Sequence, residues 1–137
     1  MIFYFSGTGN SKWAAEELAR LTGDTVASIA ELVKSGGAVE VPEGQPVGLV
    51  FPVYAWLPPE IVSNFVSMLK ADKDAYRWAV CTCGDQAGRA MEKLSEKFSL
   101  SSAWSLRMPN NYIRSFDTDP PGTVREKIRS AKERLNL

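Results

Sequence analysis

Ile2-Phe3-Tyr4-Phe5 runs directly into Ser6-Gly7-Thr8-Gly9-Asn10-Ser11, and a helical pattern of apolar residues begins immediately afterwards. This order is typical of a short buried strand, a tight loop and the start of a helix. The glycines allow the backbone to close around an anion, and the hydroxyls of Ser6, Thr8 and Ser11 can donate hydrogen bonds to it. The amides and the partial positive charge of a helix start favour the same ligand. The stretch therefore predicts a phosphate-binding loop.

Two common phosphate-binding motifs do not match this loop. The nucleoside-triphosphatase motif needs a longer spacing before its Gly-Lys-Ser/Thr ending, whereas Lys12 here follows Gly9-Asn10-Ser11. The dinucleotide-binding motif needs a third glycine, which is absent. A loop with neutral donors suits a phosphate monoester, and a strand-to-helix turn without any ligand remains the alternative.

Composition narrows the classes of function. The 16 lysines and arginines balance the 16 aspartates and glutamates, so no overall field attracts nucleic acid or an acidic membrane surface. The chain has no histidine, which removes the usual near-neutral base and most zinc sites, so we expect no metal and no catalytic side chain. Demanding chemistry is then expected to come from a cofactor.

The length of 137 residues fits one domain, spanning residues 1–137. The start of the chain lacks the pattern of a secretory signal, and no stretch approaches the length of a membrane span. We therefore expect a cytoplasmic protein without membrane contact. Cys81 and Cys83 lie two residues apart, where a disulfide would be strained, so both thiols are expected to be reduced.

Short apolar runs alternate with helical patterns along the chain, which predicts an α/β fold with a parallel sheet covered on both faces. The expected strands are residues 2–5, about 24–28, 47–51, 77–82 and 102–107. The expected core-facing helical stripes are Ala14, Leu18 and Leu21, ending at Gly23; Ile61, Phe65 and Leu69, starting at Pro58-Pro59; Met91, Leu94 and Phe98; and Val124, Ile128, Ala131 and Leu135. Residues 31–46 have room for only a short second helix before a loop.

The loops after the third and fourth expected strands could hold a flat ring system. The third strand is followed by Pro52-Val53-Tyr54-Ala55-Trp56-Leu57-Pro58-Pro59, which places two aromatic residues on a proline-stiffened turn. Thr82-Cys83-Gly84-Asp85-Gln86-Ala87-Gly88 is a glycine-containing turn into a helix, and Met108-Pro109-Asn110-Asn111-Tyr112 adds amide side chains and a third aromatic. The alternative is that these side chains only cap the sheet.

The Ser-Gly-Thr-Gly-Asn-Ser loop resembles the FMN phosphate loop of flavodoxins. Together with the aromatic loop and the Cys-Gly-Asp loop, it resembles most closely the flavodoxin domain of the bacterial EFR1-type proteins. The resemblance implies a flavodoxin-like three-layer sandwich, with a five-stranded parallel sheet in the order 2-1-3-4-5 and bound FMN. The implied cofactor-binding residues are Ser6, Gly7, Thr8, Gly9, Asn10, Ser11, Pro52, Val53, Tyr54, Ala55, Trp56, Thr82, Cys83, Gly84, Asp85, Gly88, Asn111 and Tyr112.

The resemblance also implies a function. We expect an electron-transfer protein that receives electrons from a donor reductase and supplies an acceptor reductase, as a monomer or weak dimer. The ferredoxin module of the EFR1-type proteins needs four cysteines at iron–sulfur spacing, and this chain has two. Asp85 and the pair Asp117 and Asp119, if close to the ring, would make the bound flavin a stronger reductant.

Two other functions remain open. The first is a flavodoxin-like enzyme that uses a nicotinamide, NAD(P)H, and FMN to reduce quinones. The second is a cysteine phosphatase, because Cys83 and Arg89 are separated by five residues between a strand and a helix, and Asp119 could serve as its general acid. In the small phosphatases of this fold that loop follows the first strand, a place taken here by Ser6–Ser11.

Overall fold

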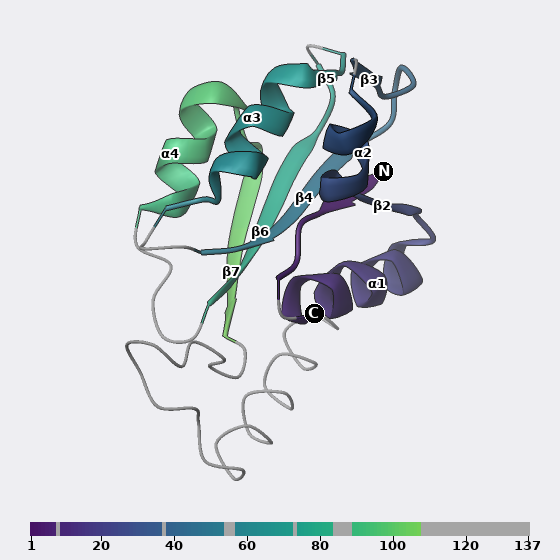
Figure 1. Cartoon of the computed structure of the whole chain (residues 1–137). Helices are drawn as coiled ribbons and strands as arrows, with labels where there is room; N and C mark the ends of the chain where they lie inside the picture. The colour runs from purple at the N-terminus through teal and green to yellow at the C-terminus, as the bar shows by residue number, and fades with distance from the viewer. Residues whose placement is uncertain (8, 37, 54–56, 73, 84–88, 108–137) are drawn as a thin grey trace, which may run out of the picture.

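The computed structural model of the chain describes residues 1–7, 9–36, 38–53, 57–72, 74–83 and 89–107. Within these ranges, five parallel strands form the main sheet in the order β2-β1-β4-β6-β7 (Figure 1). The elements in chain order are β1 (Ile2–Tyr4), α1 (Asn10–Thr22), β2 (Val26–Ser28), α2 (Ile29–Ser35), β3 (Val39–Glu40), β4 (Val47–Pro52), α3 (Glu60–Met68), β5 (Leu69–Lys70), β6 (Arg77–Cys83), α4 (Ala90–Lys97) and β7 (Ser102–Arg107).

The topology of the main sheet confirms the predicted α/β fold. Counted along the chain, its five strands have the order 2-1-3-4-5, and the ends of every predicted strand lie within two residues of the observed ones. The sequence did not predict the separate pair formed by β3 and β5, in which Val39 lies opposite Leu69. This pair is two residues long on each side, too short to leave an alternating pattern in the sequence.

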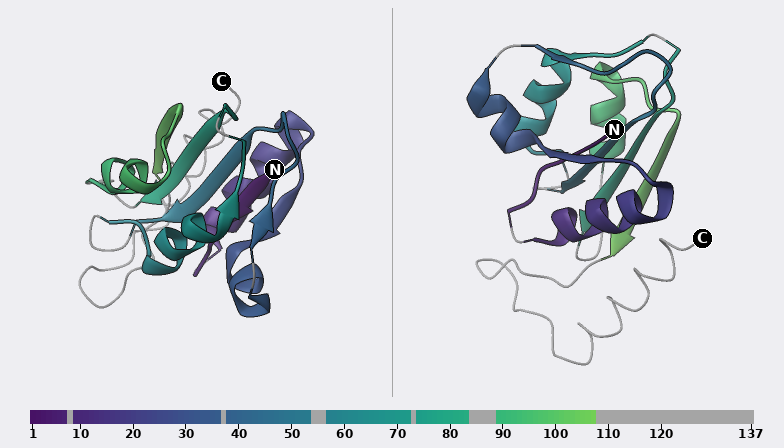
Figure 2. Two further views of the ribbon diagram at one scale, coloured as in Figure 1. Left: turned by 90° about the horizontal axis from the view of Figure 1, so that it is seen from above. Right: turned by 90° about the vertical axis from the view of Figure 1, so that its right-hand side faces the viewer.

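Helices cover both faces of the sheet, which gives three layers (Figure 2). Successive strand residues point to opposite faces. Phe3, Leu49 and Cys81 pack with α2, α3 and α4 on one face, and Ile2, Val50 and Val80 pack with α1 on the other. We call these the three-helix face and the α1 face. β4 is apolar along its whole length because both of its faces are covered.

Helix α1 ends at Gly23 as predicted, but one residue of its predicted core-facing stripe is exposed. Gly23 takes the left-handed conformation at φ 73°, and its amide bonds the carbonyl of Ala19 at 2.8 Å, which ends the helix. Ala14 and Ala15 are fully buried against the sheet. Leu21 was expected to face the core and is 41% exposed, whereas Leu18 of the same stripe packs against the core.

The other stripes show one further error. α3 buries Phe65 as expected, whereas Leu69 turns to extended backbone and belongs to β5 rather than to the helix. Leu69 still packs against the same core. In α4 and its cap, Leu94 and Phe98 are buried as predicted. The stripe from Val124 to Leu135 lies outside the described residues.

Candidate functional site

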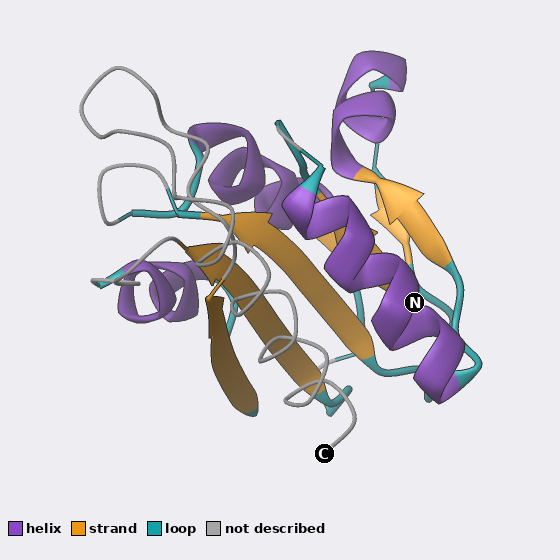
Figure 3. Ribbon diagram, turned by 90° about the horizontal axis from the view of Figure 1, so that it is seen from below, coloured by secondary structure: helices purple, strands orange, loops and turns teal. Residues whose placement is uncertain are grey.

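The predicted loops follow strands that end at one edge of the sheet. β1 and β4 are neighbours, with Tyr4 opposite Val50, and the amide of Phe5 bonds the carbonyl of Val50 at 3.0 Å. β2 lies on the outer side of β1, so the connections leave β1 and β4 in opposite directions (Figure 3). Ligands of open α/β sheets bind at the carboxyl ends of strands at such a point. The residues that follow β1 and β4 therefore form the candidate site.

The first loop has the backbone shape that an anion site needs. Gly9 lies at φ 102°, which only glycine adopts without strain, and its amide bonds Ser6 Oγ at 2.9 Å. The first bond within α1 runs from the amide of Trp13 to the carbonyl of Gly9 at 2.9 Å, so the amides of Ser11 and Lys12 have no carbonyl acceptor within the helix. Ser6 accepts a hydrogen bond here, and a serine hydroxyl that accepts a bond can also donate one.

A buried hydrogen bond joins the first loop to the end of β6. Ser11 Oγ and Thr82 Oγ1 are 2.9 Å apart, and the two residues are 1% and 4% exposed. The carbonyl of Thr82 also accepts the amide of Val53 at 3.1 Å. Ser11, Thr82 and Val53 come from three loops that the sequence assigned to one site, and Thr82 connects them. The sequence analysis treated the Ser11 hydroxyl as a ligand donor and Thr82 as a cofactor-binding residue, and the structure shows their two hydroxyls bonded to each other.

Cys81 and Cys83, at the end of β6, are not joined to each other by a disulfide. Burial, and to a smaller extent the neighbouring Cys83, raises the pKa of Cys81 from its ordinary 9.0 to about 12. Cys81 packs in the core of the three-helix face, whereas Cys83 is half-buried and its thiol points to the carbonyl of Leu106 at 3.8 Å. Cys81 is therefore a structural thiol at neutral pH.

Half of the predicted site residues are described. The described ones that share the edge at the ends of β1, β4 and β6 are Ser6, Gly7, Gly9, Asn10, Ser11, Pro52, Val53, Thr82 and Cys83. The predicted site residues outside the described residues are Thr8, Tyr54, Ala55, Trp56, Gly84, Asp85, Gly88, Asn111 and Tyr112. Asp117 and Asp119 also lie outside them. Their roles stay predictions.

The sequence analysis did not assign Lys12 to the site. This residue is exposed in the first turn of α1, directly after the loop, where a cation favours an anionic ligand. The sequence indicates this position, because Lys12 directly follows Ser11. That spacing served only to exclude the nucleoside-triphosphatase motif.

Two further features are absent from the described part of the chain. No group of three or more Cys, Asp or Glu side chains within it has the arrangement of a metal site. None of its helices combines the length and apolar character needed to cross a bilayer.

Several solved structures of flavoproteins are similar in fold to this chain. A candidate flavoprotein from Bacteroides uniformis is 16% identical, with a TM-score of 0.62 over 94% of this chain and 96% of that one. General stress protein 14 of Treponema denticola, solved in complex with FMN, is 12% identical, with a TM-score of 0.59 over 98% and 95%. The two-electron reduced flavodoxin of Megasphaera elsdenii is 15% identical, with a TM-score of 0.54 over 98% and 99%.

These likenesses show that the chain has the flavodoxin-like fold. No protein-family model matches the chain, and no curated protein sequence matches it.

Proposed function

We propose that this chain binds FMN and acts as a flavodoxin-like electron-transfer protein. The observation that carries the proposal is the turn from Ser6 to Gly9, which opens directly into the first turn of α1 at the edge where the connections diverge. A phosphate placed there would meet helix amides and a serine hydroxyl. The similar fold of a protein solved with FMN supports the same ligand.

The chain supplies binding and orientation, and FMN supplies the redox chemistry. In this proposal Ser6, Thr8 and Asn10 bind the phosphate together with the amides that start α1. The loops that contain Tyr54, Trp56 and Asp85 contact the ring and limit its access to water. Ser11 and Thr82 keep the first loop in register with the end of β6 through their buried hydrogen bond.

The role of carrier is a further part of the proposal. The chain would receive electrons from one reductase and pass them to another in the cytoplasm, and it resembles the flavodoxin domain of the EFR1-type proteins. Its balanced charge predicts weak long-range attraction to either partner. The alternative function is an enzyme that reduces quinones with NAD(P)H. The NADPH experiment described below distinguishes this enzyme from a carrier.

The test is a fluorescence titration of the purified chain with FMN and with riboflavin. FMN should bind at least about tenfold more tightly, because even one charge-assisted hydrogen bond to the phosphate contributes about 1.5 kcal/mol. Thr8→Ala and Asn10→Ala should weaken FMN and leave riboflavin unchanged, with the remote Ser35→Ala as the control. Equal affinities for the two flavins would contradict the phosphate site.

The same holoprotein separates carrier from enzyme. If the chain is a carrier, NADPH reduces its flavin only after a reductase is added. A quinone reductase turns over with NADPH and a quinone alone. The phosphatase alternative gains no support from the described residues, because the guanidinium of Arg89 pairs with Glu92 at 3.0 Å on the exposed side of α4. Hydrolysis of para-nitrophenyl phosphate that Cys83→Ser abolishes would establish it.

A further inference from the structure

The hydrogen bond between Ser11 and Thr82 joins two sides of the candidate site. Ser11 lies in the first turn of α1, which follows β1 along the chain, whereas Thr82 lies near the end of β6. β4 separates β1 from β6 in the sheet. Because neighbouring strands are about 4.8 Å apart, the bond connects segments whose strands are about 10 Å apart. It therefore fixes the first loop relative to a strand that is not its neighbour.

Thr82 makes a second connection through its backbone. Its carbonyl accepts the amide of Val53 at 3.1 Å, and Val53 directly precedes Tyr54, the first aromatic residue of the predicted ring-binding loop. Thr82 is thus bonded through its side chain to the start of α1 and through its carbonyl to the residue that follows β4. One residue connects the loop proposed for the phosphate with the loop proposed for the ring.

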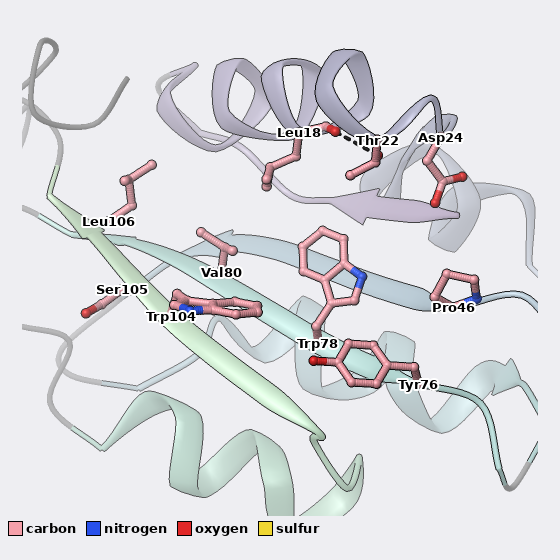
Figure 4. Close-up of a pocket in the computed structure, with 10 residues that line it drawn as sticks. All are labelled: Leu18, Thr22, Asp24, Pro46, Tyr76, Trp78, Val80, Trp104, Ser105 and Leu106. Atoms are coloured by element: carbon pink, nitrogen blue, oxygen red, sulfur yellow. Dashed lines mark hydrogen bonds between the residues drawn. The ribbon is translucent and has the colours of Figure 1, made fainter. Parts of the chain in front are cut away.

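The two hydroxyls are buried, so they are not placed to contact a ligand directly. Ser11 is 1% exposed and Thr82 is 4% exposed. Val80 of β6 and Leu106 of β7 lie on the same face of the sheet and are also buried (Figure 4). A hydroxyl that left this bond to reach a ligand would leave its buried partner unpaired, which is costly. Any effect of the two hydroxyls on a ligand then passes through the loops that they connect.

We propose that Ser11 and Thr82 are positioning residues that set the spacing between the phosphate subsite and the ring subsite. This inference rests on the proposed binding of FMN. A ligand with two linked ends binds tightly only where both subsites can take it at once. Without the bond, each subsite should still bind its own end of the ligand, and the gain from binding both ends together should fall.

The test compares three ligands on the full chain. Thr82→Val should raise the Kd for FMN about tenfold in a fluorescence titration at low temperature, where the variant stays folded. The Kd for riboflavin, which has the ring and lacks the phosphate, should change by less than about twofold. Binding of inorganic phosphate, followed through the rise in the Tm of the flavin-free chain, should also be unchanged. Ser11→Ala should give the same three results.

Two further variants separate the hydrogen bond from the volume of the side chain. Thr82→Ser keeps the hydroxyl and should restore FMN affinity to within about threefold of the wild type. Ser11→Ala combined with Thr82→Val should weaken FMN no more than either single variant, because both remove the same bond. The matched control is Thr22→Val near the other end of α1, where the hydroxyl bonds the carbonyl of Leu18 at 2.7 Å (Figure 4).

Unchanged FMN affinity in Thr82→Val would overturn the inference and leave the proposed function intact. A loss of riboflavin binding equal to the loss of FMN would also overturn it, since the ring subsite itself would then depend on the bond. An equal loss of inorganic phosphate would instead identify a hydroxyl as a phosphate ligand. A wild-type chain with no preference for FMN over riboflavin would contradict the proposed function, and this inference with it.

Discussion

On the three-helix face, Phe3, Phe51 and Phe65 are fully buried, whereas on the α1 face Trp104 is 49% exposed. Both faces belong to the same strands, and neighbouring residues of one strand contribute to each. The described helices differ between the two faces, because α2, α3 and α4 pack on one and α1 packs on the other. The comparison therefore contrasts a face whose large aromatic residues are fully buried with a face on which the indole of Trp104 is about half exposed.

The closed face should be the more sensitive to truncation of its side chains. Phe65 is fully buried in α3, and its ring lies 5.1 Å from that of Phe3. Phe65→Ala should lower the free energy of unfolding by about 3–5 kcal/mol, through lost burial and the cavity that remains. The measurement is urea unfolding, and the exposed neighbour Asn64→Ala on the same helix serves as the control.

A small effect of Phe65→Ala would show that α3 can collapse onto the sheet. The three-helix face would then be less closed than its burial indicates, and the contrast between the faces would weaken. An effect of the expected size at Phe65, with little change at Asn64, keeps the contrast.

Much of this fold could be predicted from the sequence because its strands are strongly apolar. Val47 to Phe51 forms an uninterrupted buried run, and such a run identifies a central strand of a parallel sheet. Helical spacing alone did not show that Leu21 would remain exposed or that Leu69 would leave α3. Those outcomes depend on how α1 lies on the sheet and on the pairing of Leu69 with Val39, which are tertiary contacts.

The candidate site was predictable in position but not in the bonds of its hydroxyls. Small residues between a strand and a helix predict a loop at the carboxyl end of the sheet, and Ser6 and Gly9 form that turn. The sequence could not show that Ser11 would bond Thr82, because the two residues are 71 positions apart. Their contact depends on the register of β6 beside β4.

On the α1 face, a substitution at Gly48 tests how closely the side chain of Trp78 packs on the sheet. The two residues are opposite each other on β4 and β6, and a Cβ at Gly48 would overlap the indole ring of Trp78. Gly48→Ala should lower the free energy of unfolding by about 1–3 kcal/mol, because the indole ring must move to make room for the added methyl group. Urea unfolding gives the value.

The matched rescue removes the ring. Gly48→Ala combined with Trp78→Leu should destabilise the protein by less than the sum of the two single variants, since the smaller side chain leaves room for the added methyl group. Additive effects would show that Gly48 is needed for a reason other than the indole ring.

The Ser11–Thr82 bond crosses from α1 to β6 and tests a polar contact on the α1 face. Ser11→Ala and Thr82→Val should each lower the free energy of unfolding by about 1–3 kcal/mol, because each leaves one buried hydroxyl without its partner. The double variant should be clearly more stable than the sum predicts, since no hydroxyl is then left unpaired. Full additivity in urea unfolding would mean that the two hydroxyls do not depend on each other.

The smallest effect is expected at the two thiols, which lie at different depths on the same strand. Cys81 should react with a thiol reagent at pH 8 only as fast as the protein unfolds, because its raised pKa of about 12 keeps it protonated and the core covers it. The half-buried Cys83 should react faster, so Cys83→Ser should remove the fast phase and Cys81→Ser should leave it.

The raised pKa of Cys81 also determines how its contribution to stability changes with pH. The folded pKa of Cys81 lies above the unfolded value of 9.0, so the unfolded chain loses this proton first as the pH rises. The contribution of the buried thiol to stability is complete below pH 9 and is lost as the pH rises towards 12. The difference in unfolding free energy between the wild type and Cys81→Ala should therefore shrink between pH 8 and pH 10.5. A difference that stays constant over this range would show that Cys81 ionises in the folded protein as readily as in the unfolded chain, and the core of the three-helix face would be more open to water than its burial indicates.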